Sequence, residues 1–250
     1  MPKLPAEYRF IDLSDYGRPL AVRIAQVLRN TPLTPIHVTI GFVISGLLAI
    51  YCILNQYYLG AVFFLILKSI LDAADGELAR LKNRPSYTGR FLDSVSDIIL
   101  NLLIVLSIWY VTNGSVWLAI LAFIGLELQG TLYNYYYAIL RNRHQGDTTS
   151  RIFETDVPKA HKGEEQRHVN LLFRLYRFLY GGFDKIIYTL DSSACNAPKM
   201  PNWLMTAVST FGLGFQLLLI GLMLVSGLES YILPFFLSYS VFILVFIGLR

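Results

Sequence analysis

Long apolar stretches separated by short polar connectors dominate the pattern along the chain. A helix that crosses a bilayer needs about 20 mostly apolar residues. Six stretches meet this requirement, at residues 33–54, 57–81, 88–111, 116–140, 201–226 and 231–249. Three connectors, at 55–56, 112–115 and 227–230, are so short that the helices they join must be antiparallel neighbours. The pattern therefore predicts an all-α membrane protein with six transmembrane helices in one bundle.

The basic residues indicate which side of the membrane each connector faces. If the N-terminus lies in the cytoplasm, the cytoplasmic segments and adjoining helix ends hold every Lys and Arg except Lys68. Cytoplasmic loops carry an excess of these residues. We therefore expect a multi-pass protein with both termini in the cytoplasm, divided into a cytoplasmic N-terminal amphipathic segment (1–32) and a six-helix domain (33–250). A cytoplasmic loop is expected at about 141–200.

Two cytoplasmic stretches, 18–30 and 167–180, place apolar residues on one helical face and arginines on the other. Such helices lie in the membrane interface with their cations near anionic headgroups. The alternative is a helix that packs on the cytoplasmic end of the bundle itself. The sequence leaves both interpretations open.

Composition supports a membrane protein and excludes several other classes. Hydrophobic residues make up 54% of the 250 residues and charged residues 15%, with a mean hydropathy of +0.50. A soluble domain has about 45–50% apolar and about 25% charged residues. The net charge of +4 is not gathered into a basic patch with interleaved aromatics, so we expect no nucleic-acid partner. Cys52 and Cys195 fall on opposite sides of the membrane and should not pair.

Four aspartates occupy predicted helices where lipid-facing residues would be apolar. Asp72 and Asp75 are three residues apart, and Asp93 and Asp97 are four apart, so each pair shares a helical face. A tight turn joins the two helices, so the pairs can face each other near the cytoplasmic edge. Each ionised residue costs roughly 2.5–3.5 kcal/mol at the centre of a span. Lys68 cannot neutralise four charges, whereas Mg²⁺, Mn²⁺ or Ca²⁺ ions with oxygen ligands can.

Small residues and an arginine extend the acidic stripe. Gly76 and Ala79 share the face of the first two aspartates, and Gly89 precedes the second pair. Alone, these residues favour close packing of helices. Beside four acids and Arg80, we favour room for a flat ligand, because an arginine can grip a phosphate with two hydrogen bonds.

The motif Asp72-x2-Asp75-Gly76-x2-Ala79-Arg80-x8-Gly89-x3-Asp93-x3-Asp97 resembles the signature of the CDP-alcohol phosphatidyltransferases, also called CDP-alcohol phosphotransferases. Every fixed position and spacing is present, and the resemblance covers about residues 31–140. It implies an integral membrane transferase of phospholipid biosynthesis. Such an enzyme moves a phosphatidyl or other substituted phosphate group from CDP-diacylglycerol, or a related CDP-alcohol, to an acceptor hydroxyl and releases CMP.

The resemblance also implies roles for individual residues. Asp72, Asp75 and Asp93 would ligate a two-metal centre, normally Mg²⁺ with Mn²⁺ as a substitute, and Asp97 would be the general base and also touch the second metal. Two such ions clamp the attacking and leaving oxygens of an in-line displacement. The residues that would line the cytidine diphosphate are Gly76, Ala79, Arg80, Ser86 and Gly89.

One departure from the family pattern lies at the start of the first span. Family members often carry Pro-Asn-x-x-Thr there, beside the nucleotide. This chain has Pro35-Ile36-His37-Val38-Thr39, so Pro35 is kept and His37 is a substitute for the missing asparagine. A similar stretch, Pro201-Asn202 followed by Thr206, recurs with one more residue before the threonine, and there we favour a proline that starts a helix.

Four residues are candidates for contacting the acceptor: Lys68, Glu127, Arg141 and Arg143. Glu127 lies mid-span, where an ionisable group is a functional candidate by default; it could pair with Lys68 or sit protonated against another helix. The two arginines are either ordinary positive-inside charges or a pocket for a phosphorylated acceptor. Glycerol 3-phosphate, inositol phosphate, inositol and serine all remain open. Four nearby tyrosines, 133 and 135–137, predict an interfacial aromatic belt, with the alternative that one of them lines the cavity.

Two other functions remain as alternatives. A carboxylate-based ion transporter should show inverted repeats and broken spans, and the sequence shows no convincing repeat. A catalytically inactive relative should have lost an aspartate, and all four are present. We therefore expect a transmembrane catalytic domain whose active site opens to the cytoplasm, with a CDP-alcohol donor, a small polar alcohol and membrane lipid as partners. The resemblance adds the expectation of a homodimer, which is common in the family.

Overall fold

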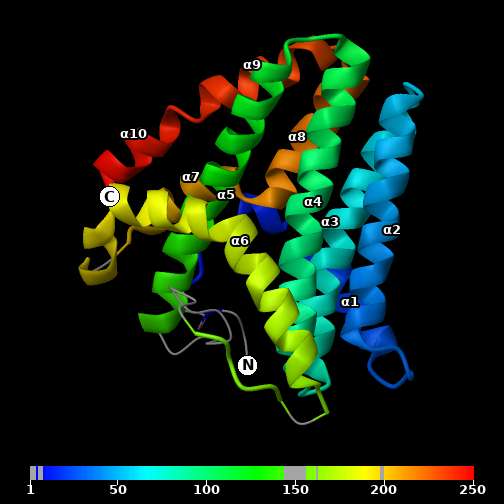
Figure 1. The fold of residues 1–250 in the computed structure, drawn as a ribbon, viewed down its shortest axis with the longest axis vertical. Coiled ribbons are helices and arrows are strands. Elements are labelled where there is room, and N and C mark those ends of the chain that lie inside the picture. Colours follow the sequence, from blue (N-terminus) through cyan, green and yellow to red (C-terminus); the bar gives the residue numbers. More distant parts are fainter. Residues whose placement is uncertain (1–3, 5–7, 144–155, 162, 198–199) are drawn as a thin grey trace.

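Four long helices form the centre of the molecule. The computed structural model describes residues 4, 8–143, 156–161, 163–197 and 200–250, and these residues form helices and connecting segments without a strand. The central helices, which follow one another antiparallel (Figure 1), are α2 (Pro35–Leu54), α3 (Tyr58–Leu81), α4 (Tyr87–Thr112) and α5 (Val116–Arg143). Their ends agree with the first four predicted spans to within three residues.

The starts and ends of these helices follow from local sequence. Thr34 caps α2, Pro35 occupies the first turn, and His37 reaches back to the cap, with 2.6 Å between Thr34 Oγ1 and His37 Nδ1. Ser86 caps α4 by accepting a hydrogen bond from the Gly89 backbone N–H at 2.8 Å. Asn113, with a φ of 49°, ends α4 in the left-handed conformation that asparagine tolerates.

The C-terminal third is helical but broken. It contains α7 (Asn202–Val208), η4 (Ser209–Phe211), α8 (Leu213–Val225), α9 (Glu229–Tyr239) and α10 (Phe242–Leu249). The predicted span 201–226 is bent by 54° at its break. The 3-10 helix η2 (Leu13–Asp15) packs into this bend, where the Leu13 N–H donates to Ser209 Oγ at 2.9 Å. A Cβ on Gly212 would lie 2.3 Å from the Ser14 Cβ, so only glycine admits this approach.

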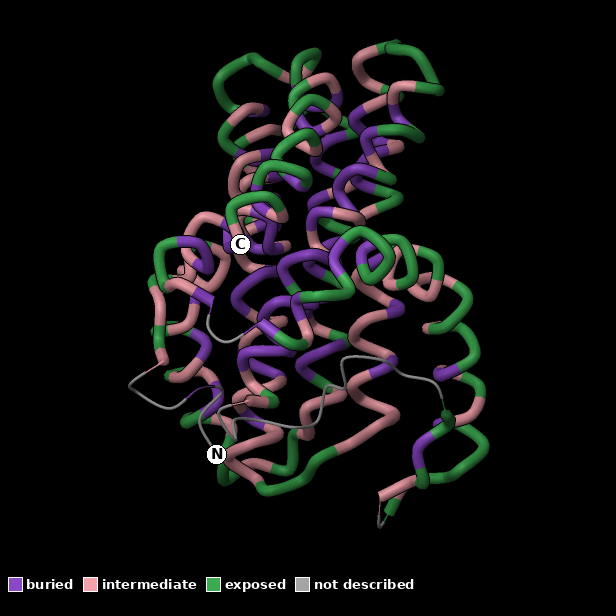
Figure 2. Tube along the Cα trace, turned by 90° about the vertical axis from the view of Figure 1, so that its left-hand side faces the viewer, coloured by how far each residue is buried: buried purple, intermediate pink, exposed green. Residues whose placement is uncertain are grey.

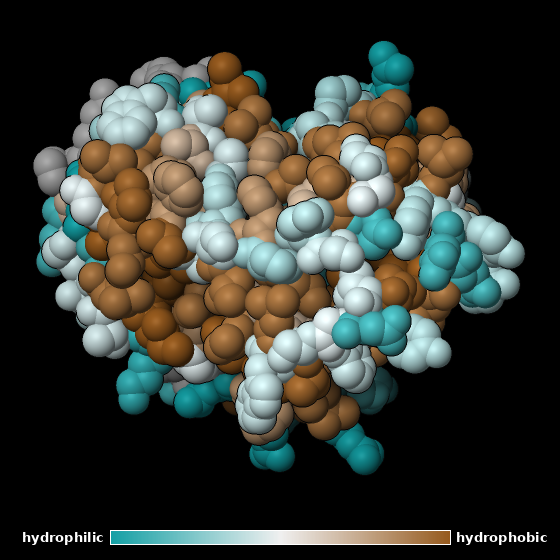
Figure 3. Space-filling model, turned by 90° about the horizontal axis from the view of Figure 1, so that it is seen from above, coloured by the Kyte–Doolittle hydropathy of each residue, from teal (hydrophilic) through white to brown (hydrophobic). Residues whose placement is uncertain are grey.

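Several helices are long and apolar enough to cross a membrane. Among the described residues these are Pro35–Leu54, Tyr87–Thr112, Val116–Arg143 and Glu229–Leu249, with the bent pair Asn202–Phe211 and Leu213–Val225 as a fifth. α3 has 24 residues but carries Lys68, Asp72 and Asp75 within its apolar sequence. Apolar side chains cover much of the molecule seen from above (Figure 3). The fold is thus all-α with four to five apolar candidate spans, and a sixth span through α3 remains a prediction.

Two further helices lie beside the central ones. α1 (Arg18–Leu28) buries Ala21 and Ala25 in a cluster with residues of α3, while Leu20 and Val27 stay exposed. The loop predicted at 141–200 contains α6 (Gln166–Leu190) and η3 (Ser192–Asn196). Residues 144–155, 162 and 198–199 of this loop lie outside the described residues. A membrane-interface location for α1 and α6 remains a prediction.

α6 is held against α4 along one face. The Phe173 ring lies 5.5 Å from that of Phe91, and the Tyr180 hydroxyl donates to the Ser94 carbonyl at 3.0 Å. Phe178 on the opposite face is 84% exposed. Buried residues concentrate midway along the molecule (Figure 2). On α6, Val169 and Phe173 are buried in a cluster with Phe91 of α4.

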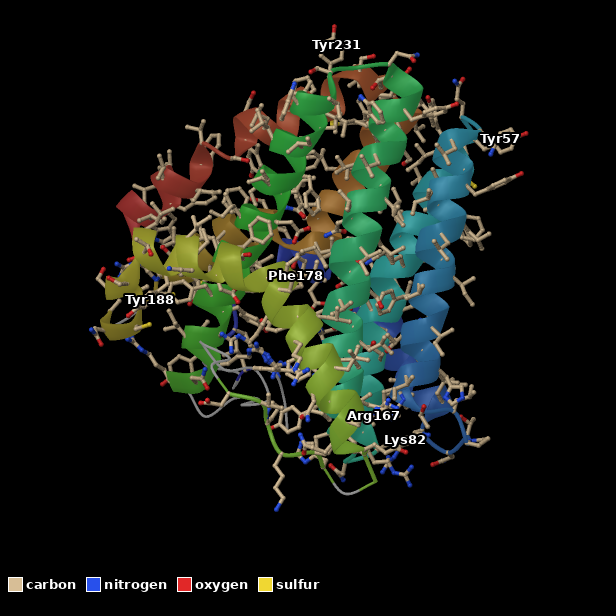
Figure 4. The ribbon with its side chains drawn as sticks, in the orientation of Figure 1. Tyr57, Lys82, Arg167, Phe178, Tyr188 and Tyr231 are labelled. Atoms are coloured by element: carbon tan, nitrogen blue, oxygen red, sulfur yellow. The ribbon has the colours of Figure 1, made fainter. Side chains whose placement is uncertain are left out.

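Aromatic and basic side chains mark opposite ends of the molecule. Tyr57 and Tyr231 lie at one end, whereas Lys82 and Arg167 lie at the other (Figure 4). Lys82 Nζ donates to the Thr31 and Leu33 carbonyls at 2.8 and 2.6 Å, which ties the end of α3 to the start of α2. This separation is what the predicted topology requires, and the side that each end faces remains a prediction.

Candidate active site

A cavity of about 400 Å³ lies among α3, α4, α5, α6, α8 and the N-terminal segment. All four motif aspartates line it, two from α3 and two from α4. The helical spacing predicted this grouping, since residues three or four apart share a face. The two pairs therefore do face each other.

Three of the carboxylates converge. One oxygen from each of Asp72, Asp75 and Asp93 lies within 4.8 Å of the other two. Asp93 Oδ1 is buried and has no hydrogen-bond partner among the described residues. Three like charges at this separation repel each other unless a cation lies between them. A donor set made only of oxygens suits a hard divalent cation, so these residues fit the metal that the motif implies.

Thr39, from the stretch at 35–39 that departs from the family pattern, orients one of these carboxylates. Thr39 on α2 donates its Oγ1 hydrogen bond to Asp75 Oδ2 at 2.7 Å, and both side chains are buried. Groups behind metal ligands commonly hold them in place in this way. The sequence pattern kept Thr39, but it did not identify the partner.

Asp97 lines the same cavity but is not one of the three converging carboxylates. Its Oδ1 accepts a hydrogen bond from Lys68 Nζ at 2.6 Å, and the Lys68 side chain is fully buried. Lys68 therefore pairs with Asp97 and not with Glu127. Glu127 Oε1 instead accepts a hydrogen bond from Asn101 Nδ2 at 3.0 Å. The roles predicted for Asp97 as base and metal ligand remain predictions.

The residues predicted to line the nucleotide divide into two groups. Gly76 and Arg80 line the cavity, and Arg80 forms an ion pair with Glu77 at 2.9 Å. Five others lie outside its wall: Pro35, His37, Ala79, Ser86 and Gly89. His37 completes the cap of α2, and Ser86 with Gly89 forms the first turn of α4.

A carboxylate from outside the motif occupies the start of α4. Glu164 accepts hydrogen bonds from Ser86 Oγ at 2.7 Å and from the backbone N–H groups of Thr88 at 2.8 Å and His161 at 3.0 Å. Partial burial of Glu164 opposes its ionisation, but these hydrogen bonds outweigh that effect and lower its pKa below the usual value. The segment before α6 is thereby fastened to the helix that carries Asp93 and Asp97.

The acceptor candidates also divide. Glu127 and Arg141 line the cavity, Lys68 lies behind Asp97, and Arg143 donates to the Cys195 carbonyl at 2.6 Å. The predicted aromatic belt is wrong. Tyr133, Tyr135, Tyr136 and Tyr137 are all buried, and all except Tyr136 line the cavity. Both cysteines are free, as expected.

Sequence reasoning missed three parts of the wall, one of which is α8 with Leu213, Gly214 and Gln216. The N-terminal segment contributes Asp12, Ser14 and Asp15, and α6 contributes Tyr176, Tyr180 and Asp184. The amphipathic pattern of 167–180 could have revealed a packed face, because one stripe of α6 is apolar. It could not indicate that this face covers the aspartates. Nothing in the N-terminal pattern pointed to the cavity.

The family comparison shows what this arrangement is similar to. The family model of the CDP-alcohol phosphatidyltransferases matches residues 33–151, a stretch that contains all four cavity aspartates. The match covers just under half of the chain, and over this region the chain is similar to that family, as the motif predicted. α6, α7–α10 and the N-terminal segment lie outside the matched stretch, so the missed parts of the wall come from there.

A curated relative is similar over a shorter stretch. The CDP-diacylglycerol–serine O-phosphatidyltransferase of Bacillus subtilis (strain 168) is 43% identical to this chain over 65 residues. That stretch covers 26% of this chain and 37% of the relative. The similarity thus concerns about a third of the relative's length.

Proposed function

We propose that this protein is an integral membrane transferase of phospholipid biosynthesis. It moves a phosphatidyl, or related substituted phosphate, group from CDP-diacylglycerol or another CDP-alcohol to the hydroxyl of a small polar alcohol. The observation that carries the proposal is the convergence of Asp72, Asp75 and Asp93, with Asp97 beside them, in one cavity of the region that matches the family. The serine transferase named above supports the reaction class.

The three converging carboxylates would hold Mg²⁺, with a second ion sharing ligands in a two-metal centre and Mn²⁺ as a substitute. When bound, the ions supply charge neutralisation for the diphosphate during an in-line displacement. Thr39 fixes the orientation of Asp75 toward this position. Arg80, at the cavity wall, is placed to bind a phosphate oxygen of the donor.

Asp97 is the proposed general base. It lines the cavity beside the three ligands, and the Lys68 ammonium group holds one of its oxygens. The acceptor oxygen forms a bond to the lipid-side phosphorus as the bond from that phosphorus to the bridging oxygen breaks. The acceptor proton passes to Asp97, and CMP leaves with the bridging oxygen. A side chain positioned as a general base typically raises the rate about 10²–10⁴-fold.

The proposed orientation places both termini and the mouth of the cavity on the cytoplasmic side. Lys82 and Arg167 lie at the same end of the molecule (Figure 4), and basic residues favour the cytoplasmic side. CMP and small alcohols are water-soluble, so a cavity near this end lets them exchange while the lipid tails stay in the bilayer. A homodimer is part of the proposal and is tested by the mass of the detergent-solubilised particle.

CMP release tests the proposed function. The protein, purified in detergent, is given CDP-diacylglycerol and Mg²⁺ with one acceptor at a time, and Asp97→Asn serves as the inactive variant. We expect acceptor-dependent CMP that requires Mg²⁺ and falls at least 100-fold in the variant. Absence of CMP with every acceptor, from folded protein that also fails to bind CDP-alcohols, would favour an inactive relative or a transporter.

A further inference from the structure

The part of the cavity beyond Asp97 is a second polar region that the proposed chemistry does not use. Glu127 lines it and is only 5% exposed, although it lies within an apolar helix. Its Oε1 accepts a hydrogen bond from the neutral amide of Asn101. Among the described residues, Glu127 has no ion-pair partner within 4.0 Å, since Lys68 donates to Asp97 instead. A buried carboxylate is costly in this setting unless a cation compensates it.

Carboxylate side chains outnumber basic side chains in the cavity wall among the described residues. Eight carboxylates line it, from Asp12, Asp15, Asp72, Asp75, Asp93, Asp97, Glu127 and Asp184, whereas three arginines do so. Lys68 lies within electrostatic reach of Asp72, Asp93, Asp97 and Glu127, and its ammonium group donates to Asp97. Divalent ions at the converging aspartates would leave Glu127 still without a cation of its own.

The arginines lie toward the opposite end of the cavity. Arg90 precedes Asp97 by seven residues on α4, about 10 Å along the axis, while Asn101 follows it by four residues, about 6 Å the other way. On α5, Arg141 lies 14 residues beyond Glu127, about 21 Å along the axis. The reacting aspartates therefore separate a basic end from an end that holds Glu127.

The remaining wall around Glu127 is neutral and partly aromatic. Tyr180 from α6 lies within electrostatic reach of Glu127, Asp97 and Asp93 and is fixed by its hydrogen bond to the Ser94 carbonyl. Gln216 from α8 lines the same cavity and donates to the Leu126 carbonyl at 3.2 Å. Aromatic rings and carboxylates together favour an ammonium group. A phosphate group here would be repelled by the like charge of the Glu127 carboxylate.

We propose that Glu127, with Asn101 and Tyr180 around it, binds the ammonium group of the acceptor, so that the acceptor is an amino alcohol. This inference rests on the proposed function. An amino alcohol has its hydroxyl and its nitrogen two carbons apart, which lets the hydroxyl meet Asp97 while the ammonium group meets Glu127. The reaction balances as before: the new P–O bond replaces the bond to CMP, Asp97 takes the hydroxyl proton, and the ammonium group keeps its own.

The test compares acceptors and variants in the purified full-length protein with Mg²⁺ and CDP-diacylglycerol. Serine, ethanolamine and choline carry an ammonium group, and glycerol, inositol and glycerol 3-phosphate do not. Glu127→Gln removes the charge and keeps the shape, and Glu127→Asp keeps the charge. Glu229→Gln is the matched control, since Glu229 lies outside the cavity wall. Binding of each amino alcohol is measured in parallel by calorimetry in the presence of Mg²⁺ and CMP.

We expect CMP release with at least one amino alcohol. Glu127→Gln should raise the KM for that acceptor about 10- to 100-fold, as expected for the loss of a hydrogen bond to a charged group. The KM for CDP-diacylglycerol should stay within twofold, Glu127→Asp should recover part of the loss, and Glu229→Gln should match the wild type. A purely structural role for Glu127 would instead change both KM values and lower the unfolding midpoint.

Other outcomes separate the inference from the proposed function. CMP release with glycerol 3-phosphate or inositol, but with no amino alcohol, would overturn the inference and leave the transferase standing. Binding of an amino alcohol that depends on Glu127 without any CMP release would overturn the transferase and leave the ammonium site standing. Amino alcohols that neither bind nor react would overturn the inference whatever the other acceptors do.

Discussion

Replacing Thr39 by valine tests whether the carboxylates converge in order to hold a metal. The substitution removes one hydroxyl and keeps the shape of the side chain. Thr39 Oγ1 donates to Asp75 Oδ2 at 2.7 Å, and both groups are buried, so water cannot easily replace the lost hydrogen bond. A hydrogen bond to a charged group is worth about 1.5–3 kcal/mol.

The expected result is a weaker metal site in a folded protein. Without the Thr39 hydroxyl, Asp75 is free to turn away from Asp72 and Asp93. Loss of a group that orients a metal ligand typically weakens metal binding about 10- to 100-fold. The assay is titration of the purified protein with Mn²⁺, followed by electron paramagnetic resonance, together with the Mg²⁺ dependence of CMP release.

Thr112→Val is the matched control. Thr112 Oγ1 donates to the Ile108 carbonyl within α4, and Thr112 lies outside the cavity wall. We expect its Mn²⁺ affinity to equal that of the wild type. If Thr39→Val also binds Mn²⁺ within twofold of the wild type, the hydrogen bond to Asp75 does not orient a metal ligand and the reasoning is refuted.

Three further predictions concern groups around the site. Lys68→Met should lower the free energy of unfolding by about 3–5 kcal/mol in a denaturant titration, because it leaves the buried Asp97 without its partner. Adding Asp97→Asn to this variant should restore part of the lost free energy. Equal free energies of unfolding for the single and double variants would contradict the pairing of Lys68 with Asp97. Asp191→Asn should cost about 3 kcal/mol, since Asp191 accepts two hydrogen bonds from Arg250 at 2.6 Å, and an unchanged unfolding midpoint would argue against this contact. The pKa of Glu164 is lowered, so its stabilisation is present above the usual pKa of a glutamate and is lost as the pH falls through the lowered value. The unfolding midpoints of wild type and Glu164→Gln should therefore differ at pH 7, and the difference should shrink as the pH falls below the usual pKa of a glutamate. A difference that stays constant with pH would contradict the direction of the pKa shift.

The central helices were predictable because their apolar stretches match the length of a span. The four central helices, α2 to α5, begin and end within three residues of the predicted bounds. Residue types that favour helix starts, such as Thr34 and Ser86, stand at the beginnings of α2 and α4. The grouping of the aspartates was also predictable, because helical spacing and a short turn between α3 and α4 leave little freedom.

The parts that could not be predicted depend on contacts between distant segments. At the bend between α7 and α8, η2 packs against Gly212, and no local signal in residues 201–226 indicates a partner near the N-terminus. Tyr136 is buried because its hydroxyl donates to Asp191 at 2.6 Å, 55 residues away. A belt of tyrosines and a buried cluster have the same sequence pattern, so only packing distinguishes them.

Crystallography with Mn²⁺ and CMP shows directly whether the converging carboxylates hold a metal. Anomalous scattering at the manganese edge locates the ion without assumptions about the protein. We expect a peak among Asp72, Asp75 and Asp93, within about 2.3 Å of a carboxylate oxygen from each. An anomalous peak elsewhere in the protein, with none among these three carboxylates, would contradict this expectation.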